Sequence, residues 1–273
     1  MRQYIVDAFT KEAFSGNPAA VCVLDEWPSD ASMMRLAREN NLSETAFIVR
    51  EAQGGSGADG AEGEVRYRLR WFTPGCEVEL CGHATLASAF VVLGILEPEA
   101  SCVAFDTMSG RLLVQRDGEQ LRMDFPTYEL REIPVTDAME AAFGARPSRA
   151  VLGLDLICVF DDESVVRGMD PNQTLLMQLP GRIQNATAAG TADADCVSRS
   201  FCPKLAIAED PVCGSAHVQI ASYWARELGK DVIRAYQASA RGGWLFCQPL
   251  EGGRMAISGD AVLVAVSDIV APL

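Results

Sequence analysis

The sequence predicts an α+β fold built from two similar halves. A short motif occurs once in each half, as Leu80-Cys81-Gly82-His83-Ala84 and as Val212-Cys213-Gly214-Ser215-Ala216, and the two copies lie about half of the 273-residue chain apart. Each copy opens an apolar stretch with helical spacing, and strand-patterned segments surround that stretch on both sides. Each half is therefore predicted to hold strands, one buried helix and further strands.

The first half alternates strand-patterned segments with turn residues. Asp117-Gly118 between two such segments is a strong two-residue hairpin signal. The acid- and glycine-rich stretch 51–64 has no periodicity and predicts a loop. The predicted strands are 3–9, 20–24, 44–49, 65–72, 111–115 and 120–125, and the predicted helices are 29–40, behind a Ser-Asp cap, and the apolar 83–94.

The second half repeats this order after a weakly patterned crossover at 127–150. The predicted domains are residues 1–126 and 127–273, with the strand at 261–273 as a candidate to complete the first domain. The predicted strands are 152–160, a region from 183 to 201, 235–238, 244–247, 254–257 and 261–266, and the predicted helices are 164–179, interrupted at Pro171, and 216–229, with Gly229 as C-cap.

Composition excludes several classes of function. The formal net charge of −14 argues against a nucleic-acid partner, because a polyanion would be repelled. Hydrophobic residues at 49% and charged residues at 22% are typical of a globular protein. No uncharged apolar run approaches the roughly 18 residues of a membrane span, and Asp7 precedes any signal-peptide core. We expect a cytoplasmic protein with no membrane partner.

The chain has nine cysteines and two histidines, and their number and spacing bear on whether it forms disulfides or binds a metal. Disulfides are not the default in a long chain without a secretory signal. No pair of cysteines has the Cys-x-x-Cys spacing and histidines are few, so we expect no metal site. Most of the cysteines are predicted to be small core residues.

Cys81 and Cys213 are candidate acid/base groups because each precedes a predicted helix. The positive end of a helix dipole can bring a thiol pKa below its free value of roughly 8.5. One such thiol could remove a proton from a carbon while a second returns one to the opposite face, which inverts the carbon without a cofactor. The alternative is that both thiols simply fit tight turns beside glycine.

Three other side chains are candidates for proton transfer. Glu44 lies at the edge of a strand beside an apolar run, where partial burial would raise its pKa, although a lone glutamate is more often solvated or capping. His83 occupies the first turn of the central helix, where its ring could donate to a carboxylate or shuttle a proton. Asp210 could cap the following turn or bond to a substrate. His217 fits a buried core position better.

A carboxylate could be held by polar groups near the same turns. The start of a helix leaves N–H groups free and favours negative charge. Asn17, Gly214 and Ser215 are the candidates for this role, through side-chain and backbone donors. Arg241, in the segment 237–243, could reach the site or belong to an ordinary hairpin.

Together these motifs resemble the PhzF-like isomerase family, named for the phenazine-biosynthesis isomerase. The resemblance is ordered and spans nearly the whole chain. Seven segments carry it: Asp7-Ala8-Phe9, Gly16-Asn17-Pro18-Ala19-Ala20-Val21, Asn41-Leu42-Ser43-Glu44-Thr45-Ala46-Phe47, Arg70-Trp71-Phe72-Thr73-Pro74, Glu79-Leu80-Cys81-Gly82-His83-Ala84-Thr85, Glu209-Asp210-Pro211-Val212-Cys213-Gly214-Ser215-Ala216-His217, and Gln237-Ala238-Ser239 through Arg241-Gly242-Gly243.

The resemblance implies the diaminopimelate epimerase-like fold: two similar domains, each a curved, mostly antiparallel sheet or barrel around a central helix, with the site in the cleft between them. It implies a cofactor-free isomerase, usually a homodimer, that transfers a proton in a small carboxylate-bearing substrate. The residues it matches are Glu44 as general acid/base, His83 and Asp210 as polar site residues, and Gly82 with Gly214 and Ser215 as anion-holding turns.

The sequence departs from the phenazine isomerase itself at Cys81 and Cys213. That enzyme lacks both cysteines, whereas the related diaminopimelate epimerases and proline racemases keep their two catalytic thiols at these places. Three functions stay open: an isomerase with Glu44 as proton carrier, a two-thiol racemase or epimerase of an amino or hydroxy acid, and a non-catalytic binding protein. A Cys81–Cys213 disulfide would add a redox role. The sequence identifies neither substrate nor oligomeric state.

Overall fold

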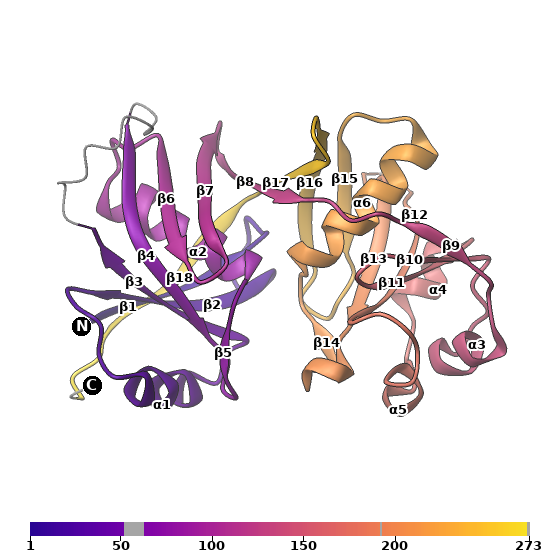
Figure 1. Cartoon of the computed structure of the whole chain (residues 1–273), viewed down its shortest axis with the longest axis horizontal. Helices are drawn as coiled ribbons and strands as arrows, with labels where there is room; N and C mark the ends of the chain where they lie inside the picture. The colour runs from indigo at the N-terminus through magenta and orange to yellow at the C-terminus, as the bar shows by residue number, and fades with distance from the viewer. Residues whose placement is uncertain (52–62, 192, 272–273) are drawn as a thin grey trace. The chain divides into compact units, whose positions relative to one another are not determined.

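The chain forms two compact units, which are shown in a computed structural model (Figure 1). The structure describes residues 1–51, 63–191 and 193–271. Unit 1 comprises Met1–Asp124 and Ser258–Leu273, and unit 2 comprises Phe125–Ile257. The chain leaves unit 1 within β8 (Gln120–Pro126) and returns to it within β17 (Arg254–Gly259).

Unit 1 is a curved sheet of mixed strand direction. Strands β1 and β2, β3 and β4, and β6 and β7 pair antiparallel, whereas β2 with β3 and β4 with β6 pair parallel. The last strand, β18, pairs antiparallel with β1. The strands are β1 (Arg2–Ala8), β2 (Asn17–Leu24), β3 (Glu44–Arg50), β4 (Glu64–Phe72), β5 (Glu77–Val78), β6 (Cys102–Thr107), β7 (Gly110–Asp117) and β18 (Ala261–Asp268).

Unit 2 repeats the same order of strand pairings. Strands β10 and β11 pair antiparallel, β11 and β12 parallel, β12 and β13 antiparallel, β13 and β15 parallel, and β15 and β16 antiparallel. In both units a two-residue strand, β5 or β14, precedes the helix that crosses over to the next parallel strand. The strands are β9 (Arg131–Ile133), β10 (Arg149–Leu152), β11 (Leu156–Phe160), β12 (Gln184–Ala189), β13 (Cys196–Phe201), β14 (Glu209–Asp210), β15 (Ile233–Gln237) and β16 (Gly243–Leu250).

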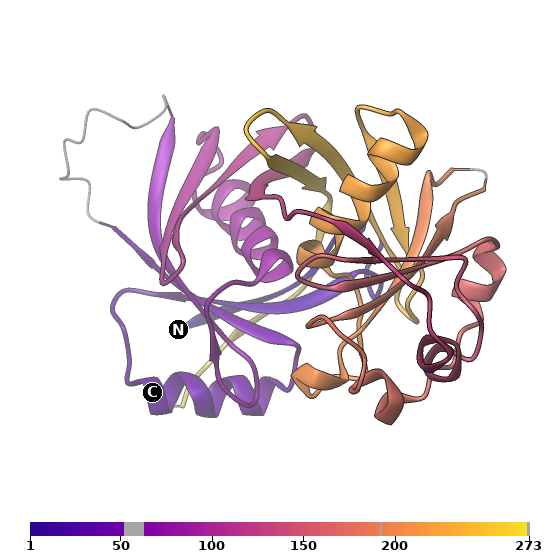
Figure 2. The ribbon, with the colours of Figure 1, turned by 45° about the vertical axis from the view of Figure 1, so that its right-hand side comes forward.

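One crossover helix packs on the sheet of each unit. In unit 1, α2 (Gly82–Val91) continues into a π-helical turn at Val92–Leu96, is buried on nearly all sides and contacts β1, β2 and β3 (Figure 2). In unit 2, α6 (Gly214–Leu228) contacts β12, β15 and β16 and ends at Gly229, whose φ of 62° is left-handed. The shorter helices are α1 (Asp30–Asn40), α3 (Asp137–Phe143), α4 (Glu163–Arg167), α5 (Gln173–Leu176) and the 3-10 turn Pro203–Leu205.

The predicted α+β fold class is confirmed, and so are several local signals. Ser29 caps α1 by accepting a hydrogen bond from the Ser32 N–H. The β7–β8 hairpin turns at Gly118, where φ is 62°. Residues 52–62 of the predicted 51–64 loop lie outside the described residues, and β4 already begins at Glu64. In the described part of the chain no helix is long and apolar enough to cross a bilayer.

Some predicted elements are wrong, and each error has a local cause. The predicted strand 152–160 contains only the last residue of β10, a turn and then β11, because the chain reverses at Gly153, whose N–H donates to the Asp155 carbonyl. The predicted helix 164–179 is two short helices, the second capped by Asn172 directly after Pro171. The region 127–150 holds β9 and α3, and the sequence pattern missed β6.

The buried helix of unit 1 generates the first prediction. Leu86 of α2 is fully buried, so Leu86→Ala removes apolar contacts and leaves a cavity. We expect the free energy of unfolding to fall by about 2–5 kcal/mol, measured by urea titration. Leu228 on α6 is 39% exposed, and Leu228→Ala should cost less than about 1 kcal/mol. Equal losses in the two variants would contradict the burial of α2.

Candidate active site

The first candidate centre lies in unit 1, where β3 and α2 begin. Glu44 is the first residue of β3, Cys81 is the N-cap of α2, and His83 is the second residue of that helix. His83 Nε2 lies 3.1 Å from Glu44 Oε2, and His83 Nδ1 lies 3.5 Å from Cys81 Sγ. The imidazole therefore stands between a thiol and a carboxylate and faces each with a different ring nitrogen.

Burial and charge together set the protonation of this centre. Burial raises the pKa of the Cys81 thiol, and the negative charge of Glu44 raises it further. Burial alone would lower the pKa of His83, but the interactions of the ring with Cys81 and Glu44 outweigh burial and raise that pKa well above 6.5. Because Cys81 is a neutral thiol near neutral pH, we assign the charge that holds the imidazolium to Glu44.

The Glu44–His83 contact is close without being a well-formed hydrogen bond. At 3.1 Å the two atoms are within ion-pair distance, yet neither Glu44 Oε2 nor His83 Nε2 makes a hydrogen bond of acceptable geometry with any described residue. The two atoms are themselves buried; the His83 side chain is 7% exposed and the Glu44 side chain 12%. Buried polar atoms without such partners are rare in folded proteins, and they are available to a bound molecule.

The same three residues form a potential metal-binding group. One ligand atom from each of Glu44, Cys81 and His83 lies within 4.8 Å of the others, and carboxylate, thiolate and imidazole are the donors that zinc uses. The sequence did not predict this group. However, His83 presents opposite nitrogens to its two partners, and one metal ion would take only one of them. The arrangement therefore fits a proton relay better than a metal centre.

The start of α2 adds backbone donors to the unit 1 centre. Cys81 makes no side-chain cap, so the first N–H groups of the helix, those of Gly82 and His83, remain available to a ligand. Asn17 begins β2 and is fully buried; β2 runs parallel to β3 with Ala19 opposite Glu44. Asn17 and Glu44 thus lie at the same end of the sheet.

The second motif occupies the equivalent place in unit 2. Cys213 is the N-cap of α6, again without a side-chain cap, and Gly214 and Ser215 are the first two helical residues. Cys213 Sγ lies 3.5 Å from Ser215 Oγ. Asp210 ends β14, and its Oδ1 accepts a hydrogen bond from the Val212 N–H at 3.2 Å. Burial raises the pKa of Cys213 well above 9.0, and the charge of Asp210 adds to that.

His217 is a core residue of unit 2. It is fully buried on α6; Nδ1 donates to the Cys213 carbonyl at 2.7 Å, and Nε2 lies 2.9 Å from Ser198 Oγ. Burial lowers the pKa of His217 to about 4, although the bond to Cys213 acts in the other direction. The ring is therefore neutral at physiological pH. Arg241 lies in the turn between β15 and β16, as an ordinary hairpin residue would.

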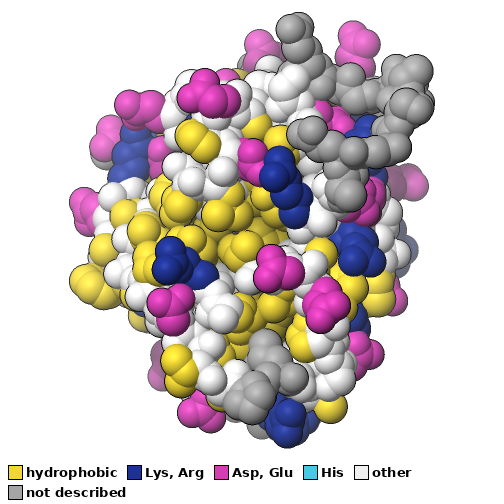
Figure 3. Space-filling view, turned by 90° about the vertical axis from the view of Figure 1, so that its left-hand side faces the viewer, with side chains coloured by type: hydrophobic (Ala, Val, Ile, Leu, Met, Phe, Trp, Pro, Cys, Tyr) yellow, Lys and Arg dark blue, Asp and Glu magenta, His cyan; other side chains and the backbone are white. Residues whose placement is uncertain are grey.

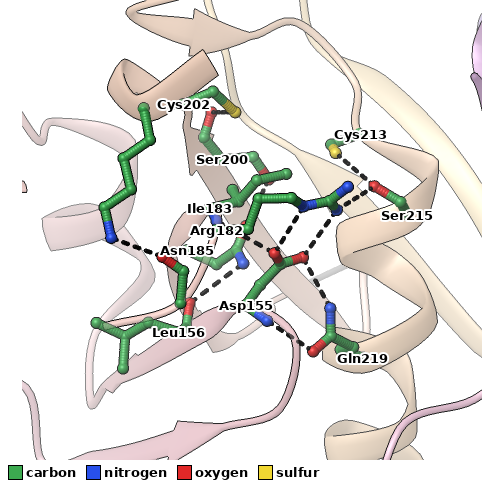
Figure 4. A network of polar contacts seen from close by, with 12 residues as sticks. Asp155, Leu156, Arg182, Ile183, Asn185, Ser200, Cys202, Cys213, Ser215 and Gln219 are labelled. Atoms are coloured by element: carbon green, nitrogen blue, oxygen red, sulfur yellow. Dashed lines mark hydrogen bonds and ion pairs between the residues drawn. The ribbon is translucent and has the colours of Figure 1, made fainter. Parts of the chain in front are cut away.

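Sequence reasoning missed four residues that surround the second motif. Gln237 holds the motif in place: its Oε1 accepts the Cys213 N–H at 2.8 Å, and its Nε2 donates to the Asp210 carbonyl. Arg182, Asp155 and Gln219 form a polar network that reaches Ser215 (Figure 4). No local motif marks them. Aligning the strands of the two halves would have brought Arg182 to attention, because it precedes β12 much as Glu44 begins β3.

All nine cysteines are free thiols. Within unit 1 the structure gathers Glu44, Cys81 and His83, and within unit 2 it gathers Asp210, Cys213 and Ser215.

Comparison with known proteins gives one consistent result. The profile of the family described as phenazine biosynthesis-like protein (PhzC-PhzF) matches residues 6–267. An uncharacterized isomerase of Pseudomonas aeruginosa is 44% identical over 261 residues, or 95% of each chain. A phenazine biosynthesis-like domain-containing protein of Mus musculus is 41% identical over 283 residues, or 96% of each chain.

Solved structures agree with this result. A PhzF family protein of Enterococcus faecalis has a TM-score of 0.90 and 45% identity, with 97% of each chain covered. A probable proline racemase of Agrobacterium radiobacter has a TM-score of 0.60 at 10% identity, with 99% of this chain and 93% of that one covered, which shows likeness of fold alone. The predicted epimerase-like fold is confirmed.

The two histidines generate the second prediction. At pH 7.5 His83 should still be an imidazolium, because Glu44 favours the charged ring, and His217 should be neutral down to about pH 5, because burial disfavours its charge. Nitrogen–proton correlation spectra of histidine-labelled protein would report both rings, with His83→Gln to assign them. Glu44→Gln should lower the titration midpoint of the His83 ring and leave that of His217 unchanged. Titration of both rings near 6.5 would contradict this description of the site.

Proposed function

The chain belongs to the phenazine biosynthesis-like (PhzC-PhzF) family of isomerases, and we propose that it shifts a proton within a small carboxylate-bearing substrate, without a cofactor. We propose Glu44 as the group that carries the proton and His83 as its partner. The observation that supports this most is the buried contact between Glu44 Oε2 and His83 Nε2, two atoms that lack well-formed hydrogen bonds to the described residues.

The proposed reaction uses the carboxylate and the imidazolium in different ways. Glu44 removes a proton from a carbon of an unsaturated or hydroxylated acid and returns it to another carbon. Negative charge then develops on the substrate, and an imidazolium beside free helix N–H groups is suited to stabilise it.

The two-thiol alternative has less support. A thiol must be a thiolate to remove a proton from carbon, but burial raises the pKa of both Cys81 and Cys213. The helix N-termini do not offset that burial. We therefore propose that Cys81 contributes by contacting His83 Nδ1. The non-catalytic alternative is set aside because the family is one of isomerases.

We assign the remaining predicted residues to substrate binding. Asn17, together with the N–H groups that begin α2 and α6, is proposed to bind polar or anionic groups of the substrate. Asp210 is proposed to bond to a substrate hydroxyl or amine, with Gln237 fixing its backbone. That the substrate lies between the two halves stays a prediction.

The homodimer and the cytoplasmic location also remain proposals. Hydrophobic side chains gather in the middle of one face, with charged side chains around and among them (Figure 3). Exposed apolar residues of unit 1 include Leu263 and Val266 of β18. An apolar surface of this kind favours self-association, which light scattering on the purified protein would measure.

The proton-carrier role of Glu44 generates the third prediction. Glu44→Gln keeps the size of the side chain but removes its basicity, so exchange of substrate hydrogen in heavy water should fall by about 10²–10⁴-fold. The measurement is proton NMR on a panel of small unsaturated and hydroxylated acids. Cys81→Ser and Cys213→Ser should each retain most of the exchange.

A matched substitution controls for nonspecific effects. Glu39 on α1 is exposed, and Glu39→Gln should catalyse the exchange of substrate hydrogen as well as the unmodified protein does. Loss of exchange in both cysteine variants, with Glu44→Gln still active, would establish the two-thiol mechanism instead.

A further inference from the structure

Unit 2 contains a guanidinium that a fully buried carboxylate holds in place. Asp155 is 0% exposed and accepts hydrogen bonds from Arg182 Nε at 3.2 Å and Nη2 at 3.4 Å. It also accepts from the Ile183 N–H at 3.1 Å and from Gln219 Nε2 at 2.7 Å, while Gln219 Oε1 accepts the Asp155 N–H. Because every side of the carboxylate is bonded, the orientation of Arg182 is fixed.

The guanidinium of Arg182 also reaches the start of α6 through Nη2. Nη2 donates to Ser215 Oγ at 3.0 Å, and Figure 4 shows the guanidinium reaching toward Ser215 and Cys213. Nη1, in contrast, has no hydrogen-bond partner among the described residues. The Arg182 side chain as a whole is 38% exposed. With Nε and Nη2 already bonded, the two N–H groups of Nη1 are the donors that Arg182 can offer to an anion.

The strand register relates Arg182 to the acid/base residue of unit 1. Thr45 and Gln184 are equivalent, because each pairs with the last residue of the neighbouring antiparallel strand, β4 or β13. Glu44 precedes Thr45 by one residue, and Arg182 precedes Gln184 by two. Both charged residues therefore lie beside the start of equivalent strands, but one position apart in register.

The residues that these two charges contact occupy equivalent positions. His83 and Ser215 are each the second residue of the crossover helix. In unit 1 the carboxylate of Glu44 lies beside His83, and in unit 2 the guanidinium of Arg182 donates to Ser215. Arginine is always protonated in proteins and cannot act as a base, so the unit 2 position is suited to binding rather than to proton transfer.

We propose that Arg182 is a substrate-binding residue that anchors the carboxylate of an organic acid through its free Nη1 edge, with Ser215 Oγ beside it. This assignment rests on the proposed function for the nature of the substrate. Asp155 and Gln219 are positioning residues. Because Asp155 already balances the guanidinium charge, the site suits a singly charged carboxylate better than a doubly charged phosphate.

Binding, separate from catalysis, provides the test. Crotonate, sorbate, lactate and benzoate, each paired with its neutral amide, are titrated by ligand-observed NMR. The unmodified protein should bind at least one acid about tenfold or more tightly than its amide, the strength of charge-assisted hydrogen bonds. Arg182→Gln should remove this preference, and Arg182→Lys should keep part of it, because lysine retains the charge but not the fork.

Arg149→Gln is the matched control and should keep the full preference. Arg149 lies in the same unit, is 40% exposed and is likewise paired with carboxylates, those of Glu132 and Glu227. Thermal unfolding checks each variant. If Arg182→Gln fails to fold because Asp155 is left buried and unbalanced, the double variant Arg182→Gln/Asp155→Asn is measured in its place.

The outcomes separate this proposal from the proton-carrier role. Acid preference that persists in a folded Arg182 variant overturns the proposal, and so does an unmodified protein that binds none of the four acids better than its amide. Glu44→Gln should keep the acid preference and lose only hydrogen exchange. If Glu44→Gln keeps both the acid preference and hydrogen exchange while Arg182→Gln loses the acid preference, Arg182 is supported as the carboxylate-binding residue. The proton-carrier role of Glu44 is then rejected.

Discussion

Both candidate centres depend on one constraint, the start of a helix that crosses over between parallel strands. The crossover from β4 to β6, and from β13 to β15, places a helix N-terminus next to the sheet. Each helix begins at a cysteine that supplies no side-chain cap, so backbone donors remain free at a fixed place. A capping serine or aspartate would satisfy those donors and weaken the site.

Burial gives the unit 1 centre its chemistry and limits which groups can act. The surroundings that raise the pKa of Cys81 also deprive it of thiolate character, even at a helix N-terminus. His83 escapes the effect of burial because a carboxylate lies 3.1 Å away. The dipole argument from sequence alone overstated the thiols, since it included the helix end and left out desolvation. His217 shows desolvation without a carboxylate partner.

The sequence alone predicted two similar halves and pointed to the residues inside the repeated motifs. It did not point to residues that lie outside those motifs. Glycine followed by apolar residues at helical spacing marks where the two helices begin. That signal made it possible to place four residues at helix starts: Cys81, His83, Cys213 and Ser215. Arg182 and Asp155 are separated along the chain and meet only through strand pairing, which no local pattern records. The single strand predicted at 152–160 hid the turn that contains Asp155.

The two units differ in a way that their common fold does not require. At the equivalent strand start one unit carries a carboxylate, which can take and release a proton, and the other carries a guanidinium, which cannot. A carboxylate can therefore serve as a base, whereas a guanidinium can only bind an anion. These are the separate roles that we propose for Glu44 in unit 1 and for Arg182 in unit 2, and each can be tested within its own unit.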